Sequence, residues 1–328
     1  MVQTNFNNLK NKVMIKLALV IPCYNEEEIL DSTTNILENF MNNLCYEKLI
    51  SPESFVLYVN DGSKDKTWEM IEGFCKEKKW FCAVKLASNV GHQNALLAGM
   101  TVAKDWCDAM VSLDADLQDD IEVIKDMINL YLNGYDIVYG VRNERTTDSF
   151  FKRSTALIFY KLMYALGVKS VYNHADFRLM SNRAVNELCK YKERNLFLRG
   201  IVPLLGYKTA KVYYNRLKRT AGESKYPLKK MLGLAVNGIT SFSIYPIQCV
   251  LYLGILFLLI ALCVFFYALH SYFINNTIPG WTSLILSIWF CAGSILIGLG
   301  IVGEYIGKIY IEVKERPRYN IEEIIKRN

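Results

Sequence analysis

The residues best suited to chemistry form one acidic stretch, Ser112-Leu113-Asp114-Ala115-Asp116-Leu117-Gln118-Asp119-Asp120. It follows an apolar run that is predicted to be a strand. In an extended segment residues i and i+2 share a face, so Asp114 and Asp116 could converge on one ion. Oxygen ligands suit Mg²⁺ or Mn²⁺, which could bridge diphosphate oxygens and neutralise the charge of a leaving nucleotide. The competing interpretation is a helix cap, which Asp119 or Asp120 is expected to provide.

Two other loops carry polar residues after predicted strands. Asp61, in Val59-Asn60-Asp61-Gly62-Ser63-Lys64-Asp65, could accept hydrogen bonds from a nucleobase or a ribose, or could belong to an ordinary Asp-Gly turn. Asn25, in Pro22-Cys23-Tyr24-Asn25-Glu26-Glu27, could bind a ligand or only cap the next helix. No Gly-x-Gly-x-x-Gly follows the first strand, which argues against an NAD-binding enzyme, and no Walker-type phosphate loop is present.

The elements that must position these loops alternate along the chain. Strands are expected at 17–21, 55–59, 83–86, 109–113 and 136–139, with helices at 26–40, 67–78, 93–102 and 121–132. This alternation predicts an α/β fold with a mostly parallel, doubly wound sheet, whose ligands bind beyond the carboxyl ends of the strands. Asn25, Asp61, Asn89 and Asp114 all fall at such ends. Later the pattern loosens, with a helix at 150–166, a short strand at 177–180 and a helix at 183–189.

The C-terminal third lacks charge, since no charged residue lies between Lys230 and Glu304. Two apolar runs, 247–269 and 281–302, are each long enough to cross a bilayer, and a pair of buried helices in a soluble core is the weaker interpretation. Basic residues flank the pair but not its loop, which predicts a hairpin with both termini cytoplasmic. We therefore expect a catalytic domain at 1–226, an interfacial amphipathic helix at 227–245, a transmembrane hairpin at 246–303 and a basic cytoplasmic tail at 304–328.

The placement of charged residues indicates which class of partner the chain binds. The chain has 328 residues and a net charge of +6, and its basic residues crowd the two flanks of the uncharged stretch. That distribution suits an anionic membrane surface, and no nucleic-acid motif accompanies it. The nine cysteines form no Cys-x-x-Cys pair. Their odd number, with Cys249, Cys263 and Cys291 inside the apolar region, favours reduced thiols in a cytoplasmic or lipid setting. The polar N-terminus predicts no signal peptide.

Together these segments resemble the inverting glycosyltransferases of family 2, which have the GT-A (Rossmann-like) fold. In particular they resemble the bacterial polyprenyl-phosphate glycosyltransferases, relatives of dolichyl-phosphate mannose synthase. The resemblance covers nearly the whole chain and includes the two apolar runs. Its motifs are residues 20–26, 59–63, 89–95, 114–118, 140–142, 176–180 and 219–226.

The resemblance implies transfer of a hexose from a nucleotide sugar, with UDP-glucose or a related UDP-sugar expected, to undecaprenyl or another polyprenyl phosphate. It implies a multi-pass protein of the bacterial inner membrane that makes a lipid-linked sugar donor for cell-envelope glycosylation. Asp61 is expected to contact the base or ribose, Asp114 the donor sugar or ribose, and Asp116 and Gln118 the metal ion. Further donor contacts are expected at Pro22, Tyr24, Asn25, Glu26, Asn89, Gln93 and Ala115, and contacts to the donor diphosphate or lipid phosphate at Arg142, Arg153, Arg219, Ser224 and Lys225.

Asp176 lies where the family places a general base. A phosphate monoester is already largely ionised near neutral pH, with a second pKa near ~6, so it needs no strong base. Asp176 could equally be a positioning group that holds Arg178.

Two rival functions remain. A processive membrane polysaccharide synthase would share the nucleotide site, but it usually carries a Gln-x-x-Arg-Trp motif, and no tryptophan here follows an arginine. A non-catalytic membrane scaffold that binds nucleotide sugars is disfavoured by the intact Asp114, Asp116 and Gln118 set. The residues leave open the sugar, the nucleotide base, the polyprenyl length and whether the protein forms a homo-oligomer.

Overall fold

The computed structural model describes residues 14–143, 174–194, 197–215 and 280–327, together with isolated positions between 247 and 266. The chain divides into two compact units. The first contains the N-terminal domain and also Arg316–Asn328 from the end of the chain. The second contains Tyr226–Glu315 and Lys161–Val168.

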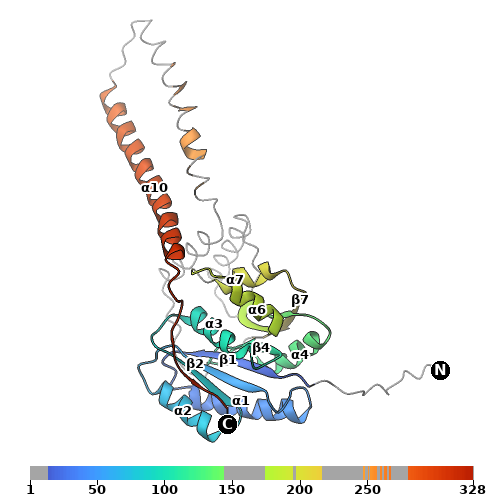
Figure 1. Cartoon of the computed structure of the whole chain (residues 1–328). Coiled ribbons are helices and arrows are strands. Elements are labelled where there is room, and N and C mark those ends of the chain that lie inside the picture. The colour runs from blue at the N-terminus through green and yellow to red at the C-terminus, as the bar shows by residue number, and fades with distance from the viewer. Residues whose placement is uncertain are drawn as a thin grey trace, which may run out of the picture. The chain divides into compact units, whose positions relative to one another are not determined.

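The first unit is built on a sheet of eight strands in the order β7-β5-β6-β4-β1-β2-β3-β8 (Figure 1). The four central strands β4, β1, β2 and β3 are parallel, as are β5 and β7, whereas β6 runs antiparallel to β4 and β5, and β8 antiparallel to β3. The prediction of a mostly parallel α/β sheet is confirmed. The strands are β1 (Leu17–Cys23), β2 (Phe55–Asn60), β3 (Phe81–Leu86), β4 (Ala109–Ser112), β5 (Ile137–Arg142), β6 (His174–Ser181), β7 (Thr209–Tyr214) and β8 (Ile321–Ile325).

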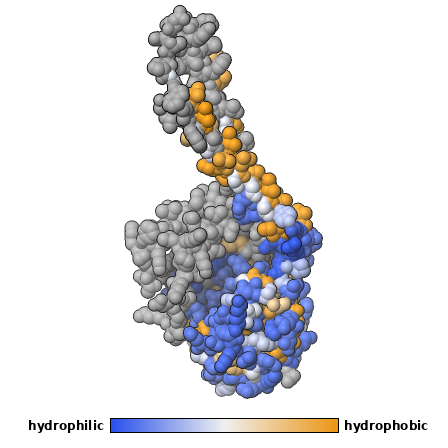
Figure 2. All heavy atoms as spheres, turned by 90° about the vertical axis from the view of Figure 1, so that its left-hand side faces the viewer, coloured by the Kyte–Doolittle hydropathy of each residue, from blue (hydrophilic) through white to orange (hydrophobic). Residues whose placement is uncertain are grey.

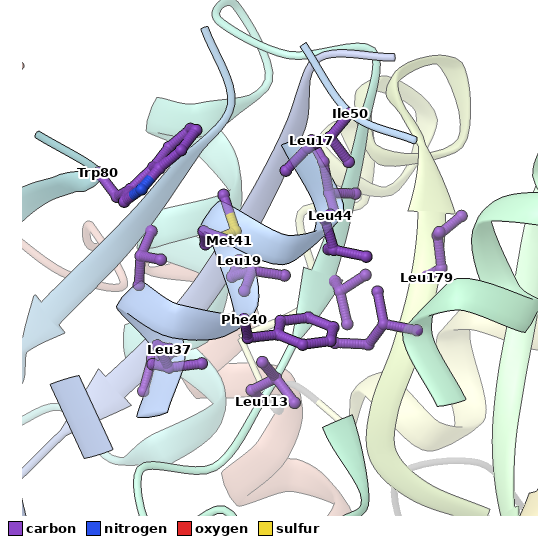
Figure 3. Packing of buried hydrophobic residues seen from close by; sticks show 14 of the residues in the cluster. Leu17, Leu19, Leu37, Phe40, Met41, Leu44, Ile50, Trp80, Leu113 and Leu179 are labelled. Carbon is purple, nitrogen blue, oxygen red and sulfur yellow. The ribbon is translucent and has the colours of Figure 1, made fainter. Parts of the chain in front are cut away.

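Helices cover both faces of this sheet. On one face, Leu17 and Leu19 of β1 belong to one buried apolar cluster with Leu37, Phe40 and Leu44 of α1 (Figure 3). On the other face, Gly99 of α3 lies so close to the sheet that an added Cβ would stand 2.5 Å from the Val59 side chain. Because α3 packs this tightly, its first turn is fixed at the carboxyl edge of the parallel strands. The helices are α1 (Leu30–Tyr46), α2 (Thr67–Glu77), α3 (His92–Ala103), η1 (Ile121–Val123), α4 (Ile124–Leu132), α6 (Asn182–Lys190), α7 (Leu198–Ile201), η2 (Val202–Leu205) and α10 (Trp281–Val313).

The second unit contains α10, which has 33 residues and is about 50 Å long. Figure 2 shows hydrophobic surface along this helix, and apolar side chains such as Leu296 are more than half exposed. Within the described residues, its segment Gly293–Val313 is the one helix with the length and hydropathy to cross a membrane. The helix continues to Val313, past the end of the span predicted at 281–302.

Several predicted features fall outside the described residues. They are the helix at 150–166, the interfacial helix at 227–245, most of the first span and the side chains of Arg153, Arg219, Ser224 and Lys225. The described positions between 247 and 266 are helical.

The end of the chain, for which the sequence predicted only a basic tail, contributes a strand to the sheet of the first unit. Residues 321–325 form β8, whose Ile324 pairs with Val84 of β3. The Tyr319 hydroxyl donates a hydrogen bond to Thr101 Oγ1 at 3.0 Å, and Arg327 Nη1 donates to the carbonyl of Pro52 at 2.7 Å. The unpaired backbone groups of β3 explain the pairing, because an exposed sheet edge accepts a further strand.

Candidate active site

A tight turn, residues 114–119, carries the predicted catalytic carboxylates just after β4. The backbone N–H of Leu117 donates to the carbonyl of Asp114 at 3.3 Å, and the Gln118 N–H donates to Asp116 Oδ1 at 3.3 Å. The expectation of an extended segment was wrong, since the chain already turns at Ala115 and Asp116. Leu117 has a φ of 43°, a conformation that costs a residue with a Cβ roughly 1–2 kcal/mol. Such strain clusters at ligand-binding sites.

Neighbouring elements hold the carboxylate turn on both sides. Thr33 of α1 donates from its hydroxyl to the carbonyl of Ala115 at 2.8 Å, so the buried Ala115 anchors the turn to the helix layer. Asp120 caps η1 by accepting from the Glu122 N–H at 3.0 Å. Of the two acidic residues considered as caps, Asp120 fills that role.

Asp119 instead organises a buried ion pair. Its Oδ1 accepts hydrogen bonds from Arg142 Nη2 at 3.0 Å and from the Tyr214 hydroxyl at 2.7 Å. Burial would lower the pKa of Arg142, but Asp119 and Tyr214 outweigh it and raise that pKa. Arg142 is therefore a fixed cation that joins the ends of β5 and β7 to the carboxylate turn.

Gln118 and Asp116 fit a divalent cation. Gln118 is only 5% exposed, and among the described residues its Oε1 has no hydrogen-bond partner. A buried carbonyl oxygen without a donor is costly, and a cation would satisfy it. The described residues contain no group of three His, Cys, Asp or Glu placed to hold a metal. Mg²⁺ commonly takes one or two protein oxygens and completes its shell with substrate phosphates and water.

Asp61 holds a loop at the end of β3. Its carboxylate accepts hydrogen bonds from the backbone N–H groups of Val90 at 2.7 Å and Gly91 at 3.0 Å. Burial raises the pKa of Asp61, while these hydrogen bonds and His92 oppose the shift. The aspartate predicted to touch the base or ribose therefore also fixes the loop that carries Asn89.

The loops after β1 and β2 are joined to each other. The N–H of Lys64 donates to Asn25 Oδ1 at 2.9 Å, and the N–H of Asn25 donates to Ser63 Oγ at 3.1 Å. The N–H of Glu26 donates to Thr67 Oγ1 at 2.9 Å. Helix α1 begins only at Leu30 without a side-chain cap, so the alternative role of Asn25 as a helix cap was wrong.

The outer face of this paired loop carries Tyr24, which is 41% exposed. Pro22 is buried within β1. The arrangement gives a rigid platform at the carboxyl ends of β1 and β2, with an aromatic side chain available for a planar ligand.

Asp176 is bound by two arginines at the start of β6. Arg178 Nη2 donates to Asp176 Oδ1 at 2.7 Å, and Arg199 donates from Nε to Oδ1 at 3.2 Å and from Nη2 to Oδ2 at 3.0 Å. Burial would raise the pKa of Asp176, but the charges of Arg199 and Arg178 outweigh it and hold that pKa well below its ordinary value. We call these three residues the Asp176 clamp.

The clamp and the carboxylate turn lie at the same edge of the sheet. Arg178 pairs with Ser112, and the Ser112 hydroxyl donates to the carbonyl of Asp176. Burial raises the pKa of Asp114, and the charge of Asp176 acts in the same direction. The imidazole of His92 lies 3.6 Å from Asp114 Oδ1 and opposes the shift.

Gln93 connects this region to α7. Its Oε1 accepts a hydrogen bond from the N–H of Leu198 at 3.0 Å. The residue expected to bind the donor thus positions the short helix that carries Arg199.

Sequence reasoning gave no role to His92, Tyr214 or Arg199. His92 lies inside a segment that carried the family resemblance, and its histidine was a usable signal. Tyr214 ends a strand that was not predicted. Arg199 lies in a four-residue helix, for which no periodic pattern exists.

Comparison with known proteins identifies the family of the chain. Residues 18–189 match the family Glycosyl transferase family 2. The uncharacterized glycosyltransferase YkoT of Bacillus subtilis is 53% identical over 93% of this chain and 91% of its own length. The prophage bactoprenol glucosyl transferase homolog of Escherichia coli is 38% identical over 95% of this chain and 100% of its own length. The bactoprenol glucosyl transferase of Shigella phage SfII is 39% identical over 94% and 98%. With the matched segment including β1 to β6 and the carboxylate turn, the chain is a glycosyltransferase and belongs to family 2.

Proposed function

We propose that the protein transfers glucose, with inversion, from a nucleotide sugar to the phosphate of a polyprenyl phosphate. The observation that carries the proposal is the meeting of the carboxylate turn and the Asp176 clamp at one sheet edge. The turn offers oxygen ligands for a metal-bound diphosphate. The clamp places the partly exposed guanidinium of Arg199 beside it, and a guanidinium suits a second phosphate.

The acceptor is inferred from two independent supports. Relatives aligned along almost the full chain are named bactoprenol glucosyl transferases, and bactoprenol is a polyprenyl lipid. The chain also carries α10, whose exposed apolar surface suits a lipid bilayer. A lipid acceptor explains why a nucleotide-sugar site and such a helix occur in one chain.

The donor is assigned to the platform at β1, β2 and β3. We expect the base to lie against Tyr24 and the loop that Asp61 holds, with the diphosphate reaching Asp116 and Gln118. A Mg²⁺ or Mn²⁺ ion held by Asp116 and Gln118 would neutralise the charge that develops on the departing nucleoside diphosphate. A UDP-sugar donor is carried over from the family resemblance.

The acceptor phosphate must be positioned against the anomeric carbon, but it does not need a general base to activate it. Near neutral pH it is largely a dianion, so an oxygen lone pair can attack the anomeric carbon without prior proton removal. Asp176, kept ionised by two arginines, is a poor proton acceptor, because an effective general base has a pKa near the working pH. We therefore assign it a positioning role. Arg142, fixed by Asp119, adds a second cation at the edge.

Connectivity supports a membrane hairpin. The strand β8 follows α10 and belongs to the same sheet as β1 to β7. If α10 crosses the bilayer, the chain must cross once more between residues 215 and 280 to begin and end in one domain. Both termini would then face the cytoplasm, as the positive-inside rule predicts.

The test is a donor panel. Purified full-length protein in detergent is incubated with radiolabelled UDP-, GDP- and dTDP-hexoses, undecaprenyl phosphate and Mg²⁺ or Mn²⁺. We expect a labelled lipid with one sugar per phosphate from a glucose donor. A lengthening polymer would support a processive synthase, and nucleotide binding without turnover would support a scaffold. Either result would overturn the proposal.

A further inference from the structure

The hydroxyl of Thr33 forms a hydrogen bond outside its own helix, unlike the hydroxyl of its neighbour Thr34. Thr34 Oγ1 donates to the carbonyl of Leu30, four residues earlier in α1, at 2.7 Å. Such a bond to the preceding turn is a common one for a threonine inside a helix. Thr33 Oγ1 instead donates at 2.8 Å to the carbonyl of Ala115, which lies 82 positions later in the chain. One helix side chain therefore holds the backbone of the carboxylate turn.

Both partners of this hydrogen bond are shielded from water. Thr33 is 3% exposed and Ala115 is 4% exposed. A buried backbone carbonyl is costly unless it accepts a hydrogen bond, and water cannot easily replace a donor that is lost there. Without the Thr33 hydroxyl, the turn would lower its free energy by moving the Ala115 carbonyl toward another donor or toward solvent.

The residues that follow Ala115 are the ones assigned to the cation. Asp116 comes next, and Gln118 has a buried Oε1 without a hydrogen-bond partner among the described residues. Between them, Leu117 has a left-handed φ of 43°. A strained conformation of this kind persists only when the surrounding contacts hold it. Because the Thr33 bond acts two residues before Leu117, its loss would allow the strain to relax and the two oxygen ligands to separate.

Helix α1 is a firm support for this hydrogen bond. Its residues Leu30 and Leu37 are fully buried in the core beneath the sheet. The helix also continues directly from the paired loop after β1, because the N–H groups of Ile29 and Leu30 both donate to the carbonyl of Glu26 at 3.1 Å. The Thr33 hydroxyl therefore fixes the carboxylate turn to the same rigid element that follows the nucleotide platform.

We propose that Thr33 is a positioning residue for the divalent cation, because its hydroxyl holds the carboxylate turn in the conformation that brings Asp116 and Gln118 to one ion. This inference rests on the proposed function. Thr33 acts through the carbonyl of Ala115 and does not itself touch the ion or the substrate. Mg²⁺ requires nearly ideal octahedral geometry, so a small displacement of its ligands lowers affinity. Groups that orient metal ligands typically change metal affinity by about ten- to a hundredfold when they are removed.

The test measures binding of Mn²⁺ to the full-length protein in detergent, by electron paramagnetic resonance in the presence of UDP. Thr33→Val removes the hydroxyl but keeps the branched shape, and Thr33→Ser keeps the hydroxyl. Thr34→Val is the matched control, because Thr34 is the next residue, is fully buried and shares a hydrogen bond with the Tyr58 hydroxyl at 2.9 Å, away from the turn. We expect the Mn²⁺ dissociation constant to rise on the order of ten- to a hundredfold in Thr33→Val only.

Two further readouts separate positioning of the turn from a general loss of stability. In the metal-free protein, the amide hydrogens of Leu117 and Gln118, which are bonded within the turn, should exchange faster in Thr33→Val than in the wild type or in Thr34→Val. In transfer assays, saturating Mn²⁺ should return kcat of Thr33→Val toward the wild-type value. Thr33→Ser should resemble the wild type in both measurements.

Unchanged Mn²⁺ affinity in Thr33→Val would overturn the inference while leaving the proposed function intact. Equal losses of Mn²⁺ affinity in Thr33→Val and Thr34→Val would also overturn it, because they would indicate a general effect of altering α1. Failure of the wild type to make any lipid product overturns the proposed function itself, so the two failures are distinguishable.

Discussion

Replacing Gly62 with alanine should weaken nucleotide-sugar binding through the loop that Asp61 holds. Gly62 has a φ of 63°, and a Cβ added there would stand 2.5 Å from the backbone nitrogen of Asn89. Ordinary contact begins at 3.4 Å, so the loop must move away by the difference, about 0.9 Å. A shift of that size would stretch the Val90 N–H bond to Asp61, now 2.7 Å, beyond hydrogen-bonding distance.

The free-energy cost of Gly62→Ala has two separate contributions, one from the backbone and one from lost hydrogen bonds. The left-handed backbone costs an alanine roughly 1–2 kcal/mol. Each lost hydrogen bond to the Asp61 carboxylate costs a further ~1.5–3 kcal/mol. Gly134→Ala is the matched control, because Gly134 has a φ of 83° but nothing within 4 Å of an added Cβ. Gly134→Ala should lose only the roughly 1–2 kcal/mol that the left-handed backbone costs.

The assay is calorimetric titration of each full-length variant with the nucleotide, alongside thermal unfolding in the same detergent. Gly62→Ala should bind the nucleotide at least about tenfold more weakly, equivalent to ~1.4 kcal/mol, while Gly134→Ala binds normally. Equal nucleotide affinity in both variants would refute the coupling of Gly62, Asp61 and the Asn89 loop to the donor site.

The remaining predictions concern the metal, pH and topology. Asp116→Ala should lose at least about a hundredfold in kcat, because a metal contributes several kcal/mol to the transition state; full wild-type activity in a chelator would contradict the metal assignment. Hydrogen bonding from Arg183 lowers the pKa of Asp136, although burial opposes it. A depressed folded-state pKa stabilises the fold above the unfolded value of ~3.9, and this contribution is lost as pH falls through the folded pKa. Asp136→Asn should therefore lower the free energy of unfolding in urea near neutral pH, and the difference from the wild type should narrow below about pH 4. A difference in unfolding free energy that stays constant with pH would exclude this linkage. With the native cysteines removed, Ser271→Cys should react with an impermeant thiol reagent on intact cells and Asn320→Cys should not, whereas the reverse pattern would contradict the hairpin.

The central sheet was predictable from sequence because its strands are buried on both faces. The runs at β1 and β2 are continuously apolar, as parallel strands covered by two helix layers must be. The ends of β2 and β4 then located Asp61 and Asp114. The edge strands were missed for the opposite reason. β7 alternates exposed and half-buried residues over most of its length, and β8 is short and largely exposed.

The sequence allowed individual residues of the candidate site to be named, but it did not indicate which of them form hydrogen bonds or ion pairs with each other. Asp114 and Asp116 were found from their spacing after a strand, and Gln118 from the family resemblance. The pairing of Asp176 with Arg199 joins residues 23 positions apart, and that of Asp119 with Tyr214 joins residues 95 apart. Such pairs depend on the antiparallel insertion of β6 and on β7, which local patterns do not specify. The same holds for β8, whose partner strand lies far earlier in the chain.

Transfer of labelled glucose to undecaprenyl phosphate by the purified full-length protein tests the central claim most directly. The lipid product should form from a nucleotide-activated glucose only when a divalent cation is present, carry one sugar per phosphate, and have the anomeric configuration opposite to that of the donor. A product with retained configuration, or transfer only to a soluble acceptor with none to the lipid, would contradict the account.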